Sequence, residues 1–294
     1  MGEKSNRFEF LEKNLKDHVV ALSHEIGERS HHHYESLEKA AEYIFQKFED
    51  HGYTPEKHTY KISGTEYGNI IATRTGRDEP YNIIVAGAHY DTVRGTPGAN
   101  DNASGVSAVL ELSRLFSTID TRKTIRFIAF VNEEPPFFRT RLMGSRVYTR
   151  QAKKNNENIL AMLSFEMIGY YSEKDGSQHY PFGIRLSHPR EANFIAIVGD
   201  LRSRRFVREC ARIFRKHSNF DIQSVSVPRF IPGVDFSDHW SFWKEGYRAA
   251  MVTDTAFYRY DDYHTSHDTF EKLGYGKMAQ VVEGFYHVLA ELGE

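Results

Sequence analysis

Residues 83–91 read IIVAGAHYD, an apolar run that leads directly to a histidine and an aspartate. An unbroken apolar run of this length predicts a strand buried on both faces, which is typical of a parallel sheet covered by helices. The pattern of an apolar strand followed by acidic side chains occurs twice more along the chain. The two runs are TIRFIAFV (124–131), followed by Glu133 and Glu134, and ILAMLSF (159–165), followed by Glu166.

Amphipathic segments alternate with these strands. Apolar residues recur at steps of three and four in 7–27 and again in 35–51, which predicts two N-terminal helices. The alternation predicts one α/β domain over residues 1–294: three layers, α/β/α, around a central mixed, largely parallel sheet, with the helices of about 7–51 packed on it. The other expected elements are strands at 58–63, 67–74, 193–198 and 249–253, helices at 104–117, 142–153, 201–217 and 276–292, and loops at 172–191 and 225–235.

The composition of the 294 residues excludes several classes of protein. Lys and Arg total 38 against 40 Asp and Glu, and a net charge of −2 argues against a dedicated nucleic-acid binder. No apolar run approaches the ~18 residues that span a bilayer, so no membrane partner is expected. Cys210 is the single cysteine and cannot form an internal disulfide. Because residues 1–25 contain no signal-peptide core, the sequence as written is expected in the cytoplasm, or in secreted or periplasmic form if a leader has been removed.

The acidic and imidazole side chains after the predicted strands indicate a metal site. In open α/β sheets, ligands bind beyond the carboxyl ends of the strands, and these side chains would meet there. Nitrogen and oxygen donors without a thiolate favour zinc, cobalt or manganese. One catalytic zinc usually takes three protein ligands, so five side chains fit two ions if one carboxylate, for which Asp101 is the candidate, bridges them. The five are His89, Asp101, Glu134, Glu166 and His264.

A simpler interpretation exists for each of these residues taken singly. One acidic residue at a strand end is most often a solvated turn residue or a helix cap, and Asp101 could cap the helix that begins near Ser104. Glu133 and Glu134 could lie in an exposed loop. The coincidence of all these side chains at one edge of the sheet favours the metal site.

Six motifs in a fixed order extend this interpretation. They are AHYDTV (88–93), PGANDNASG (97–105), NEE (132–134), SFEMIG (164–169), DFSDH (235–239) and YHTSHDT (263–269). With them the chain resembles the co-catalytic zinc aminopeptidases, a family that includes aminopeptidase Y, the bacterial leucyl aminopeptidases, glutamate carboxypeptidase II and the glutaminyl cyclases. The resemblance covers roughly residues 35–290 and implies a zinc-exopeptidase-like fold.

The resemblance implies two Zn²⁺ ions as cofactors, with Co²⁺ or Mn²⁺ as alternatives. It assigns His89 and Glu166 to one ion, Glu134 and His264 to the other, and Asp101 to a bridge between them. Many relatives carry aspartate where this chain has Glu166, so the geometry around that ion could differ.

The resemblance also implies the reaction. Glu133 would be the catalytic acid/base and not a ligand, and Asp91 would accept a hydrogen bond from the ring of His89. A cis peptide bond would follow Asp101. The expected function is zinc-dependent hydrolysis of N-terminal residues from peptides with a free N-terminus, through a metal-bridging water that Glu133 deprotonates.

Three residues are expected near the substrate. Asp238 lies in a stretch that lines the pocket in relatives, although it could instead cap a helix through Phe242. Phe257 and Tyr258 are expected in the wall of the pocket, with core packing as the alternative. An apolar wall would favour bulky apolar P1 residues. The natural substrate and the oligomeric state stay open.

Two other functions also stay open. A glutaminyl-peptide cyclotransferase has the same fold but uses a single zinc, and such relatives usually carry tryptophan where this chain has Tyr263. A non-catalytic interaction module would be expected to lose ligands, whereas this chain retains all five together with Glu133. The sequence therefore favours the aminopeptidase.

Overall fold

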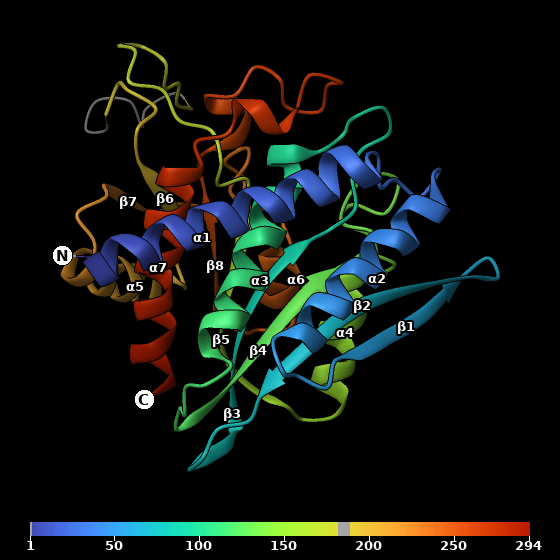
Figure 1. The fold of residues 1–294 in the computed structure, drawn as a ribbon. Helices are drawn as coiled ribbons and strands as arrows, with labels where there is room; N and C mark the ends of the chain where they lie inside the picture. The colour runs from blue at the N-terminus through green and yellow to red at the C-terminus, as the bar shows by residue number, and fades with distance from the viewer. Residues whose placement is uncertain (1, 182–188) are drawn as a thin grey trace.

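The computed structural model describes residues 2–181 and 189–294, with one eight-stranded sheet at its centre (Figure 1). The strand order is β1-β2-β4-β3-β5-β8-β6-β7. Strand β3 runs parallel to β4 and β5, β5 to β8, and β6 to β7, whereas β1–β2, β2–β4 and β6–β8 pair antiparallel. The sheet is mixed and mostly parallel, as the sequence predicts. The strands are β1 (Glu56–Ile62), β2 (Thr65–Arg74), β3 (Glu79–His89), β4 (Lys123–Phe130), β5 (Asn158–Glu166), β6 (Ile195–Gly199), β7 (Ile222–Ser226) and β8 (Ala249–Thr253).

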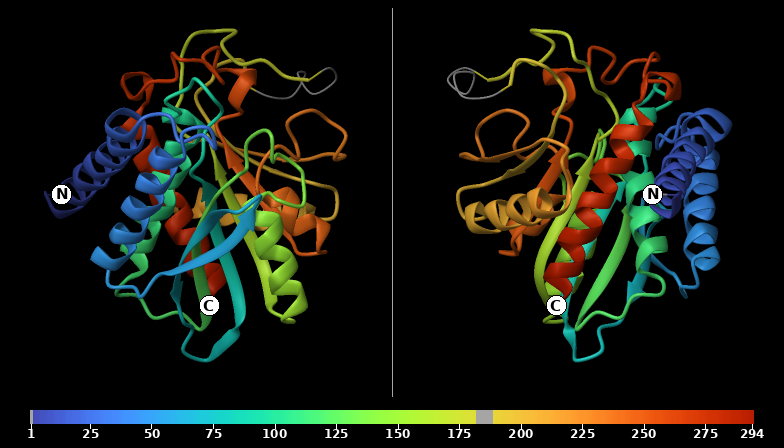
Figure 2. Two further views of the ribbon diagram at one scale, coloured as in Figure 1. Left: turned by 90° about the vertical axis from the view of Figure 1, so that its right-hand side faces the viewer. Right: turned by 60° about the vertical axis from the view of Figure 1, so that its left-hand side comes forward.

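Helices cover both faces of this sheet (Figure 2). Side chains of α2, α3, α5 and α7 fill the core on one face, and those of α4 and α6 fill it on the other. Helix α1 packs against α3 and α7 and so lies in an outer layer. The helices are α1 (Gly2–Val20), α2 (Tyr34–Asp50), α3 (Gly105–Phe116), α4 (Gly144–Lys154), α5 (Arg204–His217), α6 (His239–Lys244) and α7 (Tyr275–Gly293), with the π-helix η1 (Ala21–Ile26) and the 3-10 turns η4 (Ala256–Tyr258) and η5 (Phe270–Lys272). The segment η2 (Ala99–Ser104) is not a continuous helix, because the backbone of Asp101 and Asn102 is non-helical.

Strand β3 shows why its sequence is an unbroken apolar run. Ile84 and Ala86 belong to the core on the α3 side, whereas Ile83 and Val85 belong to the core on the α4 side. Because successive side chains of a strand point to opposite faces, a strand covered on both sides needs apolar residues at every position. The runs at 124–131 and 159–165 form β4 and β5, so the three strands that the sequence marks most clearly are confirmed.

The expected elements differ most from the structure in two places, the start of the first helix and the strand β7, which was not predicted. The first helix begins at Gly2 and not near residue 7, and it continues into the π-helix η1. Residues 225–226, expected in a loop, belong to β7. This strand lies at the edge of the sheet and is partly exposed, with polar residues among its five positions, so no apolar run marks it in the sequence.

The predicted loop at 172–191 has no helix or strand in its described parts, 172–181 and 189–191, and the rest of that prediction lies outside the described residues. The region between β5 and β6 is therefore irregular wherever it is described. In the described part of the chain, no helix combines the length and the apolar character needed to cross a bilayer.

Candidate metal centre and active site

The candidate residues meet at the edge of the sheet where the parallel strands end, at the top of the molecule in Figure 1. His89 and Glu166 are the last residues of β3 and β5, and Glu134 lies just beyond β4. Asp101 lies in η2, which leads into α3, and His264 lies in the loop after β8. Parallel strands share one carboxyl edge, so segments that are far apart in the sequence come together here.

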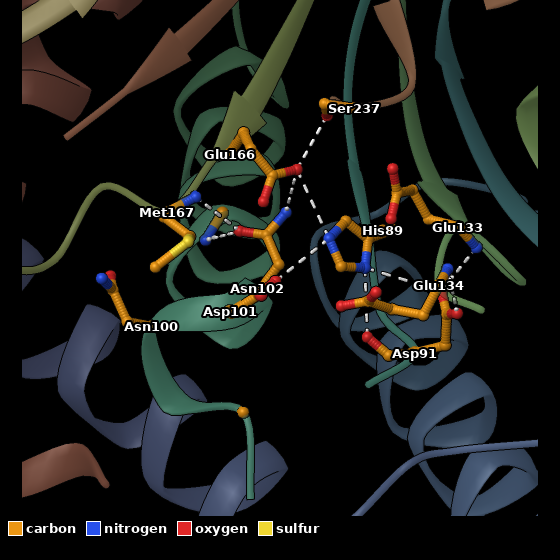
Figure 3. A network of polar contacts seen from close by, with 12 residues as sticks. His89, Asp91, Asn100, Asp101, Asn102, Glu133, Glu134, Glu166, Met167 and Ser237 are labelled. Atoms are coloured by element: carbon orange, nitrogen blue, oxygen red, sulfur yellow. Dashed lines mark hydrogen bonds and ion pairs between the residues drawn. The ribbon is translucent and has the colours of Figure 1, made fainter. Parts of the chain in front are cut away.

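Two groups of three side chains share Asp101, and Figure 3 shows the first of them. In that group, Nε2 of His89 lies 3.4 Å from Oδ1 of Asp101 and 3.4 Å from Oε2 of Glu166. In the second, Nε2 of His264 lies 3.0 Å from Oδ2 of Asp101 and 3.2 Å from Oε1 of Glu134. The carboxylate of Asp101 turns one oxygen toward each group, and each group could hold a metal ion.

The chemistry of these donors fits divalent metal ions. Asp101, Glu134 and Glu166 are buried, and across residues 2–181 and 189–294 none of the three forms an ion pair with lysine or arginine. Oδ1 of Asp101 is buried and has no hydrogen-bond partner in the same residues. Buried carboxylates are normally paired or coordinate metals. Nitrogen and oxygen donors of this kind suit zinc.

Asp91 and Glu133 lie beside the two groups. The carboxylate oxygens of Asp91 accept hydrogen bonds from the backbone N–H groups of Glu133 and Glu134, each at 3.0 Å (Figure 3). Nδ1 of His89 lies 3.1 Å from the backbone carbonyl of Asp91 and 3.5 Å from its carboxylate Oδ1. Asp91 thus links the ring of His89 to the acidic turn after β4. Glu133 is buried, and burial raises the pKa of its carboxyl well above its ordinary value.

Further polar residues fix the candidate ligands, and the sequence does not single them out. Ser237 donates its hydroxyl to Oε2 of Glu166 at 2.7 Å. Asp268 accepts a hydrogen bond from the backbone N–H of Asp101 at 3.0 Å. The peptide bond between Asp101 and Asn102 is cis, as the resemblance implies. All of these residues lie inside the six motifs, so the motifs mark the right segments of the chain. The role of each of these residues cannot be predicted from the motifs alone.

Without a bound metal, both histidines and Glu134 of the centre bind protons strongly, whereas hydrogen bonds from His264 and His89 outweigh burial and hold the pKa of Asp101 below its ordinary value. Burial alone would lower the pKa of His264, but hydrogen bonds to Asp101 and Glu134 outweigh it and raise that pKa to about 10. Burial also opposes a charge on His89, yet Glu166 and the neighbouring aspartates raise its pKa well above its ordinary value. Burial, followed by the charge of Asp101, raises the pKa of Glu134 to about 7.

The metal-free protein is therefore expected to lose stability as the pH rises from about 6 to about 9. Histidine in an unfolded chain has a pKa of about 6.5, so the proton that His264 retains stabilises the fold fully below that pH and ceases to do so as the pH approaches 10. The raised pKa of Glu134 also makes the stability of the fold decrease as the pH rises, up to about pH 7. We expect the Tm to fall by about 5 °C or more over this range, measured by calorimetry in chelator, and zinc to reverse the fall. A flat or rising Tm in chelator would contradict this assignment.

An apolar cavity opens beside Glu166, with a volume of about 840 Å³ that includes space open to solvent. Phe257 and Tyr258, the two aromatic residues predicted for the wall of a substrate pocket, line this cavity. Tyr263 also lines it, and its ring stacks on His264 with 3.7 Å between the ring centroids. The remaining lining is mostly apolar and includes Met167, Phe194, Ala196, Val198, Val225, Val234, Phe236 and Met251.

Asp238 has a different place from either expected role. It precedes α6 at the N-cap position, but its side chain makes no capping hydrogen bond. It is fully buried and is not among the residues that line the cavity. Burial raises the pKa of its carboxyl to about 7; the charge of His89 lowers this pKa, and the charge of Glu166 raises it. Asp238 is therefore a buried carboxyl that neither caps α6 with its side chain nor lines the cavity.

Comparison of the sequence with known proteins identifies the family of this chain. Residues 69–289 match the model of Peptidase family M28. The chain belongs to this family. One relative, the uncharacterized protein YfbL of Escherichia coli (strain K12), is 38% identical over 286 residues, which cover 94% of this chain and 87% of YfbL. Membership of the M28 family implies a hydrolase that acts on peptides.

Solved structures share the fold of this M28 peptidase. The zinc aminopeptidase BSAP from Bacillus subtilis superposes with a TM-score of 0.77 at 17% identity, over 96% of this chain and 95% of BSAP. The glutaminyl cyclase from Bacteroides thetaiotaomicron superposes with a TM-score of 0.72 at 17% identity, over 95% of this chain and 97% of the cyclase. The fold is thus the single α/β domain of the zinc aminopeptidases, and it alone does not separate the two activities.

Proposed function

We propose that this M28 peptidase is a zinc-dependent aminopeptidase that removes apolar residues from the free N-terminus of peptides. The observation that carries the proposal is the pair of groups that share Asp101, which are buried except for the half-buried His264, with Glu133 beside them. When bound, two zinc ions would lower the pKa of a water molecule and polarise the scissile carbonyl. The proposed ligands are His89 and Glu166 for one ion, Glu134 and His264 for the other, and Asp101 for both.

Glu133 would act first as the general base and then as the general acid. One of its carboxyl oxygens lies close to side-chain atoms of His89 and Glu134, but Glu133 belongs to neither group that shares Asp101, and this position supports the proposed role. It would take a proton from the attacking water and return that proton to the leaving amine. A carboxyl whose pKa is raised by burial suits a group that must hold a proton for part of the cycle. The backbone hydrogen bond to Asp91 holds Glu133 in place.

The cavity supports an apolar residue at the N-terminus of the substrate. It begins at Glu166 and Met167, next to the first candidate metal group, and extends over β6 and β8. A substrate whose carbonyl lies at the centre would place the side chain of its first residue there. A lining of this kind favours side chains such as leucine, phenylalanine or methionine.

A panel of peptides tests the activity directly. The zinc-loaded protein is incubated with peptides that begin with leucine, phenylalanine, alanine or glutamine, with N-acetylated copies as controls, and product masses are followed. Loss of one whole N-terminal residue from the free peptides, and none from the acetylated copies, is expected. Loss of ammonia alone from the glutamine peptide would indicate a cyclotransferase. No change on any peptide would contradict both activities.

The size of the cavity is expected to set the choice of the N-terminal residue. Ala196 is buried on β6 and lines the cavity, so Ala196→Leu would fill part of it. We expect kcat/KM for phenylalanine and leucine peptides to fall about 10-fold or more, because a pocket discriminates roughly 10- to 200-fold for each methylene. The alanine peptide, measured with the same preparation, serves as the internal control and should change far less. Equal losses on all three peptides would show that Ala196 does not face the substrate.

A further inference from the structure

Arg29 lies between η1 and α2 and has no exposed surface. A buried charge is costly unless it is paired, and arginine normally pairs with a carboxylate. In the described parts of the chain, the guanidinium of Arg29 forms no ion pair and donates instead to five backbone carbonyls. Nε donates to the carbonyl of Tyr90 at 2.8 Å, and Nη2 donates to that of Gly98 at 2.8 Å. Nη1 lies within hydrogen-bond distance of the carbonyls of Leu22 (2.9 Å), Gly27 (2.9 Å) and Pro97 (2.7 Å).

Three of these carbonyls belong to the segment that joins two candidate metal ligands, His89 and Asp101. The carbonyl of Tyr90 follows His89 directly, and those of Pro97 and Gly98 lie shortly before Asp101. The backbone of Arg29 binds the same segment, because its N–H donates to Oγ1 of Thr92 at 3.0 Å and its carbonyl accepts from the N–H of Thr92 at 3.3 Å. Arg29 therefore holds both ends of the segment.

Asp268 also binds the backbone of this segment, at its Asp101 end. Its carboxylate accepts the backbone N–H groups of Asn100 at 2.8 Å and Asp101 at 3.0 Å, and the hydroxyl of Tyr260 donates to it at 2.9 Å. A cation thus binds the carbonyls before Asp101, and an anion binds the amides at Asp101. The carboxylate that is shared by both metal groups is fixed through its backbone by opposite charges.

The contact between Arg29 and the segment leaves no free space. Gly98 has a φ of +62°, and a Cβ there would lie 2.5 Å from the carbonyl oxygen of Asp101, 2.4 Å from Cγ2 of Thr92 and 2.9 Å from Nη2 of Arg29. Only glycine meets both demands, a left-handed φ and a close approach. A change at Arg29 would therefore be transmitted to the backbone that carries Asp101.

We propose that Arg29 is a positioning residue of the metal centre, which fixes His89 and Asp101 relative to each other by binding the backbone between them. The inference rests on the proposed function. It makes the segment before α2 part of the centre, although this segment supplies none of the proposed ligands. Lysine cannot replace arginine here, because an ammonium offers three donors from one point and cannot reach carbonyls spread around a planar guanidinium.

Metal binding tests this role without any peptide. Zinc affinity is measured by competition with a chromophoric chelator, and the visible spectrum of the cobalt-loaded protein reports ligand geometry. For Arg29→Lys and Arg29→Gln we expect zinc to bind about 10-fold or more weakly, the size of effect typical of residues that orient ligands, and the cobalt spectrum to change. Arg126→Lys is the matched control: Arg126 is largely buried on β4 and bonds Glu157 and the hydroxyl of Tyr148, so its loss should lower the Tm and leave zinc affinity unchanged.

The outcomes separate the possible failures. A folded Arg29→Lys protein with a lowered Tm but the zinc affinity and cobalt spectrum of the unmodified protein would overturn the positioning role. An unmodified protein that binds no zinc would overturn the proposed metal centre itself, which is a different result. If neither Arg29 variant folds, Thr92→Val removes one hydrogen bond between Arg29 and the segment. Weaker zinc binding in that variant would then support the role, and unchanged binding would overturn it.

Discussion

Replacement of Glu133 by glutamine is expected to abolish most peptide hydrolysis while both metal ions stay bound. Glutamine has the shape of glutamate but cannot take a proton from water or return one to the leaving amine. Positioned acid–base groups contribute about 10²- to 10⁴-fold, so kcat should fall within that range and KM should change little. Steady-state kinetics, together with the metal content of the same preparation, check this result.

The matched control for this variant is Glu111→Gln. Glu111 is buried on α3, like Glu133 at the metal centre, but it bonds Arg114 and Asn14 and lies outside the candidate centre. Its replacement should lower the Tm and leave kcat near that of the unmodified protein. A Glu133→Gln enzyme that retains its full kcat with both ions bound would show that Glu133 is not the acid/base.

Replacement of Asp101 by asparagine is expected to have the second large effect, on metal binding as well as on catalysis. The carboxylate of Asp101 turns one oxygen to each group, and an amide offers only one oxygen and no negative charge. We expect the zinc content to fall below two ions for each chain. A metal ion contributes several kcal/mol to the transition state, so kcat/KM should fall by about 10²- to 10⁴-fold.

Asp200→Asn provides the control for this change. Asp200 is a buried aspartate paired with Arg229, and it is not among the residues of the two metal groups. Its replacement should reduce stability without changing the zinc content. Two zinc ions retained in Asp101→Asn would contradict the assignment of Asp101 as the shared ligand.

Much of the fold could be predicted because the central strands are covered on both faces. That environment demands apolar residues at every position, and β3, β4 and β5 carry such runs. Strand β7 could not be found in the same way, since it lies at the edge, is partly exposed and contains polar residues. A buried strand requires a recognisable run of apolar residues, whereas a partly exposed edge strand accepts polar residues and cannot be recognised in this way.

The candidate ligands could be located because each follows a recognisable strand or lies in a distinctive motif. Arg29 and Asp268 could not be located in this way, because they act on backbone N–H and carbonyl groups, which every residue carries. For Asp238 the motif could be recognised in the sequence, but the position of the side chain could not be predicted. The depth at which its carboxyl is buried depends on the packing of α6 and not on local sequence.

The number and position of the bound metal ions decide whether two metal sites share Asp101. An anomalous difference map from crystals of the zinc-loaded protein, recorded above the zinc absorption edge, would show each ion separately. We predict two peaks, one between His89 and Glu166 and one between Glu134 and His264, with Asp101 in contact with both. A single peak, or peaks away from Asp101, would contradict the shared centre on which the proposed activity rests.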